Sequence, residues 1–191
     1  MIREKLIKDM IIGKEVLDLG SLGQTNSYSL WNNVYKNSGY KSLTGIDLED
    51  ASQTALSHFN LKPSELPSDS RIVYGNFETY QFGKQFDVIV AGDLIEHVNN
   101  QGLLLQNVNR HLKTDGVFVL TTPNSKWLTG FLKPNPTHVL WHDEFTLRRV
   151  LNINGFEIEN LMYYYGNKKN YNFLLRILVL RQSIIVICKK K

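Results

Sequence analysis

The stretch Lys14-Glu-Val-Leu-Asp-Leu-Gly-Ser-Leu-Gly23 decides the fold of this chain. Val16, Leu17 and Leu19 form a short apolar run that stops at Gly20, as a buried parallel strand stops at its carboxyl end. A glycine at that point lets backbone amides approach a ligand without an intervening side chain. The stretch therefore predicts a strand whose tip contributes to a binding site.

A second apolar run, Leu43-Thr-Gly-Ile46, ends in Asp47, which lies 27 positions after Gly20. A glycine turn after one strand and an acid at the tip of the next suit a ligand that carries a ribose diol, because a carboxylate accepts hydrogen bonds from both hydroxyls. The pair indicates nucleoside binding, although glycine-ended strands also occur without it.

Apolar runs alternate with segments of helical spacing along most of the chain. The runs predict strands at 14–20, 42–48, 71–74, 86–91, 116–123, 156–165 and 183–188. Helical spacing and capping residues predict helices at 2–12, 26–39, 50–60, 103–112 and 143–154, with loops at 61–70 and 124–137. This alternation indicates βαβ units and a parallel sheet, into which a late hairpin-like pair inserts an antiparallel strand.

Ligands of such sheets bind beyond the carboxyl ends of the strands. The residues at those ends are Gly20, Asp47, Asn76 and Asp93, which are separated by up to 73 positions in the sequence. We therefore expect these four residues to converge at one edge of the sheet.

The composition is that of a globular protein of 191 residues, 42% hydrophobic and 21% charged, and predicts a single domain over 1–191. The one cysteine, Cys188, excludes an internal disulfide and a cysteine-rich zinc site. The first residues lack the apolar core of a secretory signal, and no run approaches the roughly 18 apolar residues of a membrane span. The expected location is cytoplasmic.

Charge is distributed unevenly. Residues 1–159 hold 15 Lys and Arg against all 18 Asp and Glu, a formal charge of −3, whereas residues 160–191 hold seven bases and no acid. Such a segment suits a phosphorylated substrate, nucleic acid or peripheral contact with an anionic membrane. The alternative is a solvated edge of the sheet.

Five stretches together resemble the class I S-adenosylmethionine-dependent methyltransferases, in particular the small-molecule group that includes the ubiquinone-biosynthesis type. They are Val-Leu-Asp-Leu-Gly (16–20), Thr-Gly-Ile-Asp (44–47), Gly-Asn-Phe-Glu (75–78), Phe-Asp-Val-Ile-Val-Ala-Gly-Asp-Leu-Ile-Glu-His-Val (86–98) and Leu-Lys-Thr-Asp-Gly-Val-Phe-Val-Leu-Thr-Thr-Pro-Asn (112–124). One departure is that Leu22 and Gln24 stand where the family has glycines.

The resemblance implies an α/β, Rossmann-like class I methyltransferase fold. Its sheet has seven mostly parallel strands, with the last strand antiparallel and helices on both faces. The implied cofactor is S-adenosyl-L-methionine, which leaves as S-adenosyl-L-homocysteine.

By the same resemblance, one set of residues binds the adenosine. Asp47 accepts from the ribose hydroxyls, and Leu48 lies against the adenine. Asn76 accepts from the adenine amino group, and Phe77 supplies a backbone amide and apolar cover. The alternative for this last pair is a turn asparagine followed by a core phenylalanine.

The other cofactor residues meet the methionine end. Gly20, Ser21 and Gly92 offer backbone groups to the methionine moiety, and Asp18 orients them from behind. Asp93 places a carboxylate beside the sulfonium, which is cationic.

Histidines are the candidate bases for the acceptor, because their pKa suits proton transfer near neutral pH. The resemblance and position favour His97, just after the fourth strand, and His142; His138 and Trp141 lie close in sequence and can wall the acceptor pocket. The alternative for each histidine is a purely structural role. No metal is expected, because the histidine spacing shows no converging carboxylates.

The favoured hypothesis is methyl transfer, at oxygen, to a small-molecule or glycan-type acceptor. The small acceptor is expected because one compact domain lacks a separate recognition module. Three alternatives remain open: an NAD-dependent oxidoreductase, although its Gly-x-Gly-x-x-Gly is absent; a non-catalytic nucleoside-binding protein; and a nucleic-acid methyltransferase that uses the basic segment. Nucleic acid is the less favoured partner.

Overall fold

The structure is a computed structural model that describes residues 2–21, 30–36, 38–48, 69–127, 132, 135–164 and 182–191. The elements within these ranges are α1 (Ile2–Ile11), β1 (Glu15–Leu19), the helical turn η1 (Trp31–Tyr35), β2 (Ser42–Asp47), β3 (Ser70–Tyr74), β4 (Phe86–Gly92), the short turn η3 (Ile95–His97), α3 (Gln101–His111), β5 (Leu112–Pro123), α5 (Glu144–Ile153), β6 (Phe156–Tyr164) and β7 (Ser183–Lys190). The predicted helix at 50–60 and loop at 61–70 lie mainly or wholly outside the described residues, as do Leu22 and Gln24.

All seven strands form one sheet in the order β3-β2-β1-β4-β5-β7-β6. Neighbouring strands from β3 to β5 pair in parallel, and β7 is antiparallel to both of its neighbours. The predicted fold class is therefore confirmed, including the antiparallel last strand. The chain order reverses direction across the sheet between β1 and β4, which is where ligands of such sheets bind.

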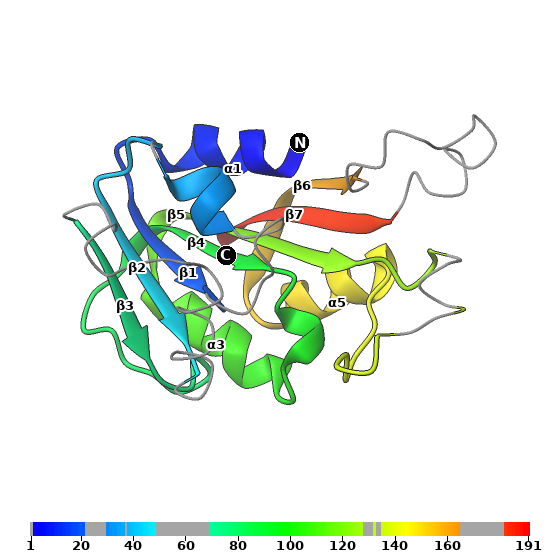
Figure 1. The fold of residues 1–191 in the computed structure, drawn as a ribbon. Coiled ribbons are helices and arrows are strands. Elements are labelled where there is room, and N and C mark those ends of the chain that lie inside the picture. Colours follow the sequence, from blue (N-terminus) through cyan, green and yellow to red (C-terminus); the bar gives the residue numbers. More distant parts are fainter. Residues whose placement is uncertain are drawn as a thin grey trace.

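Helices cover both faces of the sheet (Figure 1). One face packs against α1 and η1 through a cluster that includes Ile7, Ile11 and Val34. The opposite face packs against α3 and α5 through a cluster that includes Leu104 and Leu147. Because both faces are buried, the central strands are apolar without alternation, which explains why their sequences read as continuous runs.

The helix α5 illustrates how the sequence sets an element's boundary. Asp143 caps its amino end: the carboxylate accepts from the backbone N–H of Thr146, and the Thr146 hydroxyl accepts from the N–H of Asp143. This reciprocal arrangement satisfies two backbone donors that the helix leaves open. Gly155, with φ of +83°, follows the last turn.

One predicted boundary is wrong. Strand β5 begins at Leu112 rather than at Gly116, because Leu112 already pairs with Phe86. The ladder then shifts, and Val117 pairs with Val88. The residues that suggested a turn, Asp115 and Gly116, thus form an irregularity within the strand, which local turn chemistry alone does not distinguish from a loop.

The carboxyl ends of the strands are joined to one another by backbone hydrogen bonds. The N–H of Gly20 donates to the carbonyl of Ile46 (2.9 Å), and the N–H of Gly75 donates to the carbonyl of Asp47 (2.9 Å). On the other side of β1, Leu19 pairs with Ala91. The predicted convergence of distant strand tips at one edge is confirmed. Within the described part of the chain, every helix is too short or too polar to reach across a lipid bilayer.

Candidate functional site

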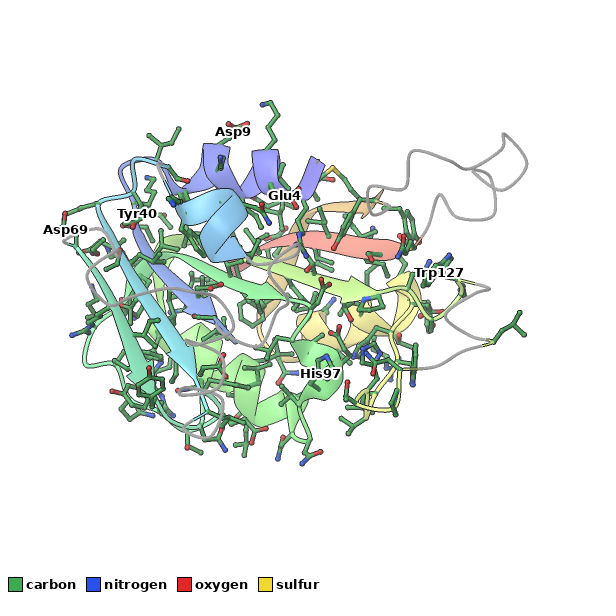
Figure 2. All side chains as sticks on the ribbon, viewed as in Figure 1. Glu4, Asp9, Tyr40, Asp69, His97 and Trp127 are labelled. Atoms are coloured by element: carbon green, nitrogen blue, oxygen red, sulfur yellow. The ribbon has the colours of Figure 1, made fainter. Side chains whose placement is uncertain are left out.

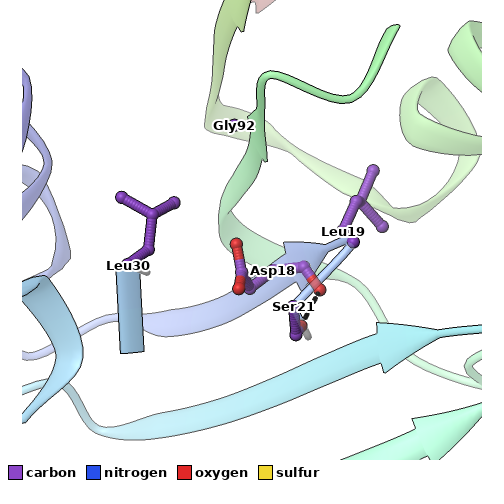
Figure 3. A pocket seen from close by; sticks show the side chains of 6 residues that line it. Asp18, Leu19, Ser21, Leu30 and Gly92 are labelled. Carbon is purple, nitrogen blue, oxygen red and sulfur yellow. Dashed lines mark hydrogen bonds between the residues drawn. The ribbon is translucent and has the colours of Figure 1, made fainter. Parts of the chain in front are cut away.

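A recess opens where β1 ends beside β4. Its lining consists of Asp18, Leu19, Gly20, Ser21, Leu30 and Gly92 (Figure 3). Gly20 has φ of +72°, a left-handed conformation that side chains resist, and a Cβ there would lie 2.9 Å from Cδ1 of Leu94. The turn after β1 therefore requires glycine both for its backbone conformation and for space.

Asp18 and Ser21 are fixed by the protein itself. The Ser21 hydroxyl donates to the Asp18 carbonyl at 2.8 Å, and both residues are buried. In Figure 3 the Asp18 carboxylate points to the side of β1 on which Leu30 lies, opposite to the Leu19 side chain. Burial and the neighbouring Asp18 carboxylate raise the pKa of Tyr35 well above its usual range. The orienting role of Asp18 toward a cofactor stays a prediction.

Asp47 ends β2 within the same edge. Its Oδ1 accepts from the N–H of Leu48 at 2.8 Å, and the residue is 6% exposed. The adjoining Leu48 is 50% exposed, so its side chain is accessible to a ligand. A buried acid followed by an exposed apolar side chain suits a ribose with its base lying alongside.

The segment after β3 contains both predicted adenine residues. The Asn76 Oδ1 accepts from the N–H of Glu78 at 2.8 Å, as in an Asx turn, and its carbonyl accepts from Thr79 and Tyr80. Phe77 is buried, and its carbonyl accepts from the side chain of Asn107 at 2.8 Å. The Asn76 side chain thus forms a turn, as the alternative interpretation expected. Its oxygen has a second lone pair that can accept from adenine, and this contact stays a prediction.

Asp93 occupies the tip of β4 with φ of +51°. Its Oδ2 accepts from Arg3 at 2.8 Å and its Oδ1 from the Thr121 hydroxyl at 3.0 Å. Arg3 is itself 2% exposed and comes from α1, so the first helix of the chain is connected to the tip of the fourth strand. The placement of Asp93 beside a sulfonium remains a prediction, and its carboxylate is already paired with a cation.

These strand tips fit a cofactor that carries adenosine and an amino-acid moiety. Gly20 and Gly92 line a recess with backbone groups, the carboxylate of Asp47 suits a diol, and Leu48 offers an apolar surface. Gly20, Asp47 and Gly92 are brought to one edge from three adjacent strands.

A second group of polar side chains begins three residues after Asp93. One ligand atom from each of Glu96, His97 and His138 lies within 4.8 Å of the other two. The His97 and His138 rings meet edge to face, with centroids 4.7 Å apart, and Trp141 packs on His138. Figure 2 shows His97 on the face of the sheet opposite α1. A carboxylate thus does converge with the histidines, contrary to the premise on which no metal was expected.

The segment that contains His138 is held in place by Glu96. The backbone carbonyl of Glu96 accepts from the N–H groups of Val139 (2.9 Å) and Leu140 (3.2 Å). The Nδ1 of His97 lies 3.0 Å from the carbonyl of Thr137. Because a carbonyl only accepts, Nδ1 of His97 carries the hydrogen, and Nε2 of the neutral ring presents a lone pair.

His142 lies deeper than His97. It is 4% exposed, and its Nε2 is 2.8 Å from Nε2 of Gln101. The same amide nitrogen donates to the carbonyl of Ile95 at 3.1 Å, so it is the Gln101 amino group that faces the ring. Nε2 of His142 therefore accepts, and burial lowers the pKa of its imidazole. The predicted catalytic role of His142 would require it to exchange this contact for a substrate proton.

Glu96 has an unusual environment for a carboxyl group. It is 2% exposed, and its Oε2 accepts from the Thr122 hydroxyl at 3.0 Å. Burial and the nearby Asp93 carboxylate raise the pKa of Glu96 to about 8. Burial, together with His97, lowers the pKa of His138.

A pH-dependent stability follows from Glu96. Between its pKa of about 4.5 in the unfolded chain and about 8 in the folded protein, only the folded form holds the proton. The free energy of unfolding therefore loses a contribution as pH rises through this window. In the wild type, we expect this contribution to lower the free energy of unfolding by more than about 1 kcal/mol between pH 5 and pH 8, and we expect Glu96→Gln to lack this decrease. Urea unfolding in chelator-treated buffer measures it.

The comparison with the variant isolates Glu96 from its titrating neighbours. His138 and His142 have lowered pKa values, so they make stability rise as pH increases toward the histidine range. The wild type and Glu96→Gln share that contribution. Parallel stability profiles for the wild type and Glu96→Gln would show that the carboxyl titrates normally.

Two residues of the site were missed from sequence. Arg3 lies 90 positions from Asp93, and nothing in the sequence pairs them. Glu96 is part of the quoted stretch 86–98, of which only Gly92, Asp93 and His97 were predicted as site residues. The usable signal was a charged residue directly after the buried Ile95, because an acid inside an apolar run must have a partner.

The chain is similar to known proteins over most of its length. A family model described as a methyltransferase domain matches residues 5–161. The (S)-coclaurine N-methyltransferase of Papaver somniferum is 28% identical over 130 residues, which are 67% of this chain and 34% of that protein. The chain thus spans about a third of the length of this curated relative.

Solved structures show the same fold at low sequence identity. An S-adenosylmethionine-dependent methyltransferase from Clostridium acetobutylicum is 17% identical, with a TM-score of 0.64 over 99% of this chain and 89% of that one. The glycopeptide N-methyltransferase MtfA in complex with S-adenosyl-L-homocysteine is 16% identical, with a TM-score of 0.69 over 99% and 88% of the two chains.

Proposed function

Because this chain belongs to the methyltransferase domain family, we propose that it transfers a methyl group from S-adenosyl-L-methionine to a small-molecule or glycan-type acceptor, at oxygen. The observation that carries the proposal is the convergence of Gly20, Asp47 and Gly92 at one sheet edge. The cofactor supplies an electrophilic methyl group on a sulfonium and leaves as S-adenosyl-L-homocysteine.

The protein's own part is to bind and orient. Asp47 holds the ribose hydroxyls, a charge-assisted contact, while Leu48 and Phe77 enclose the adenine and Asn76 accepts from its amino group. The methionine end lies over the tips of β1 and β4, against Gly20, Ser21, Gly92 and Asp93, with Asp18 behind them. Alignment of the acceptor with the methyl group contributes on the order of 7–11 kcal/mol in such reactions.

The acceptor side favours oxygen. Glu96, His97 and His138 lie together a few residues after the tip of β4, and a hydroxyl must lose its proton during methylation. His97 is exposed and its Nε2 lone pair is available to the acceptor, whereas His142 is engaged by Gln101. Trp141 gives the acceptor an apolar wall. We assign His97 the leading acceptor-side role and His142 a supporting one.

Nitrogen is the second candidate acceptor atom. The curated relative is a coclaurine N-methyltransferase, and one structural neighbour is a glycopeptide N-methyltransferase. A neutral amine already carries a nucleophilic lone pair, so this reaction needs less help from a base.

Two measurements test the proposal. Calorimetry with S-adenosyl-L-homocysteine is expected to show one binding site per chain, and its absence at high protein concentration would refute methyl transfer. Transfer of labelled methyl groups is then measured on acceptors matched in scaffold, with hydroxyl or amine at one position. Methylation of the hydroxyl member supports oxygen, and exclusive methylation of the amine overturns it.

The basic segment 160–191 adds a proposal about location. We place the enzyme in the cytoplasm with peripheral contact to anionic membranes through these seven bases, and not on nucleic acid. Sedimentation with vesicles of anionic or neutral lipid tests the contact, and equal sedimentation with both would contradict it. RNA and DNA binding that falls with salt would instead favour a nucleic-acid substrate.

A further inference from the structure

The geometry points to a divalent transition-metal site formed by Glu96, His97 and His138. The three residues come from η3 and from a segment about 40 positions later, and one ligand atom of each lies within 4.8 Å of the others. Two imidazoles and one carboxylate are a donor set used by zinc, iron, cobalt and manganese sites with open coordination positions.

The carboxylate is prepared for a cation. Glu96 is 2% exposed, and its Oε1 is buried without a hydrogen-bond partner among the described residues, while Oε2 accepts from the Thr122 hydroxyl. A buried polar oxygen without a partner is unfavourable, and metal binding releases the proton that this carboxyl group holds near neutral pH. A bound cation would satisfy this oxygen, and the Thr122 hydroxyl already orients the other one.

The histidines carry the features of metal ligands. Nδ1 of His97 donates to the Thr137 carbonyl, which fixes the ring and directs Nε2 outward, as the second hydrogen bond of a metal-bound histidine commonly does. The Nδ1 of His138 is buried with no hydrogen-bond partner among the described residues.

The spacing requires only a small closure. Ligands at about 2.0–2.1 Å from a tetrahedral ion lie about 3.3 Å apart, so the farthest donors must approach by about 1–1.5 Å. His97 is exposed, so its ring can tilt about the Nδ1 hydrogen bond to Thr137 and provide this movement. The nitrogen-rich donor set selects zinc or cobalt over magnesium and calcium, which prefer oxygen ligands.

The site's position gives it a role that rests on the proposed function. A cation there lies at the end of β4, on the acceptor side, where it can bind an acceptor oxygen and lower the pKa of its hydroxyl. His97 then serves as a ligand and does not itself remove the proton. Metal binding by these three residues does not depend on the proposed function, because it needs neither cofactor nor acceptor.

The test is metal binding by the full chain after chelator treatment. We expect one equivalent of Co²⁺ to produce ligand-field absorption in the visible range, and calorimetry to show one Zn²⁺ site that Mg²⁺ does not fill. Glu96→Gln and His97→Ala should each weaken Zn²⁺ binding at least tenfold. Glu157→Gln, an exposed acid on β6, is the matched control and should bind like the wild type.

The outcomes separate cleanly. Absence of Co²⁺ absorption, or equal Zn²⁺ affinity in all four proteins, overturns the site. Affinity for S-adenosyl-L-homocysteine, measured on the same samples, shows that the variants are folded and tests the proposed function separately. His97→Ala is the safer variant for folding, because its side chain is exposed whereas Glu96 is buried.

Discussion

Replacing Asp47 by alanine should reduce affinity for S-adenosyl-L-homocysteine about 100-fold. The carboxylate is expected to accept from both ribose hydroxyls, and hydrogen bonds to a charged group contribute about 1.5–3 kcal/mol each. A loss of about 2.7 kcal/mol corresponds to 100-fold. Asp47 is 6% exposed at the tip of β2, so water compensates poorly for the lost contacts. Calorimetry on the wild type and the variant measures the ratio.

Two further variants make the result specific. Asp47→Asn keeps an oxygen for the N–H of Leu48 and removes only the charge, so it should fold normally and bind more weakly than the wild type. Asp69→Ala removes an exposed acid at the amino end of β3, the opposite edge of the sheet, and should leave affinity unchanged. If Asp69→Ala lost as much affinity as Asp47→Ala, the loss would come from the change in net charge and not from lost contacts to the ribose.

The sheet could be predicted because its strands are buried on both faces. Val16, Leu17 and Leu19 leave no ambiguity between strand and surface, and a glycine or acid ends the runs of β1, β2 and β4 where the chain reaches the edge. Once the strands are parallel, the rule that ligands bind at their carboxyl ends brings Gly20 and Asp47 together without any knowledge of distances. The late hairpin-like pair predicted an antiparallel strand, and the family resemblance implied the same.

The acceptor side was predicted less well, because long-range contacts shape it. Glu96 reaches His138 only because its carbonyl anchors Val139 and Leu140, a contact that no local pattern encodes. Similarly, Arg3 pairs with Asp93 through the packing of α1 on the sheet. Local sequence indicates that a residue can ionise or ligate, but tertiary packing decides which groups it meets.

The turn after β1 gives the second large effect, since Gly20→Ala changes both backbone energy and space. A left-handed conformation costs an alanine about 1–2 kcal/mol, and Gly20 has φ of +72°. Its new methyl group would also lie 2.9 Å from Cδ1 of Leu94, a side chain buried in the core. We expect a decrease of about 2–4 kcal/mol in the free energy of unfolding, together with at least a tenfold loss of affinity for S-adenosyl-L-homocysteine.

The variant Gly13→Ala separates the cost of the backbone conformation from the cost of the steric contact. Gly13 has φ of +68°, nearly the same backbone conformation, but a Cβ there meets no atom within 4 Å. This variant should therefore carry the backbone cost alone, about 1–2 kcal/mol, and bind S-adenosyl-L-homocysteine like the wild type. Urea unfolding and calorimetry on both variants measure the difference. Equal cofactor affinity in the two would mean that the tip of β1 does not contact the cofactor, because of these two glycines only Gly20 lines the recess.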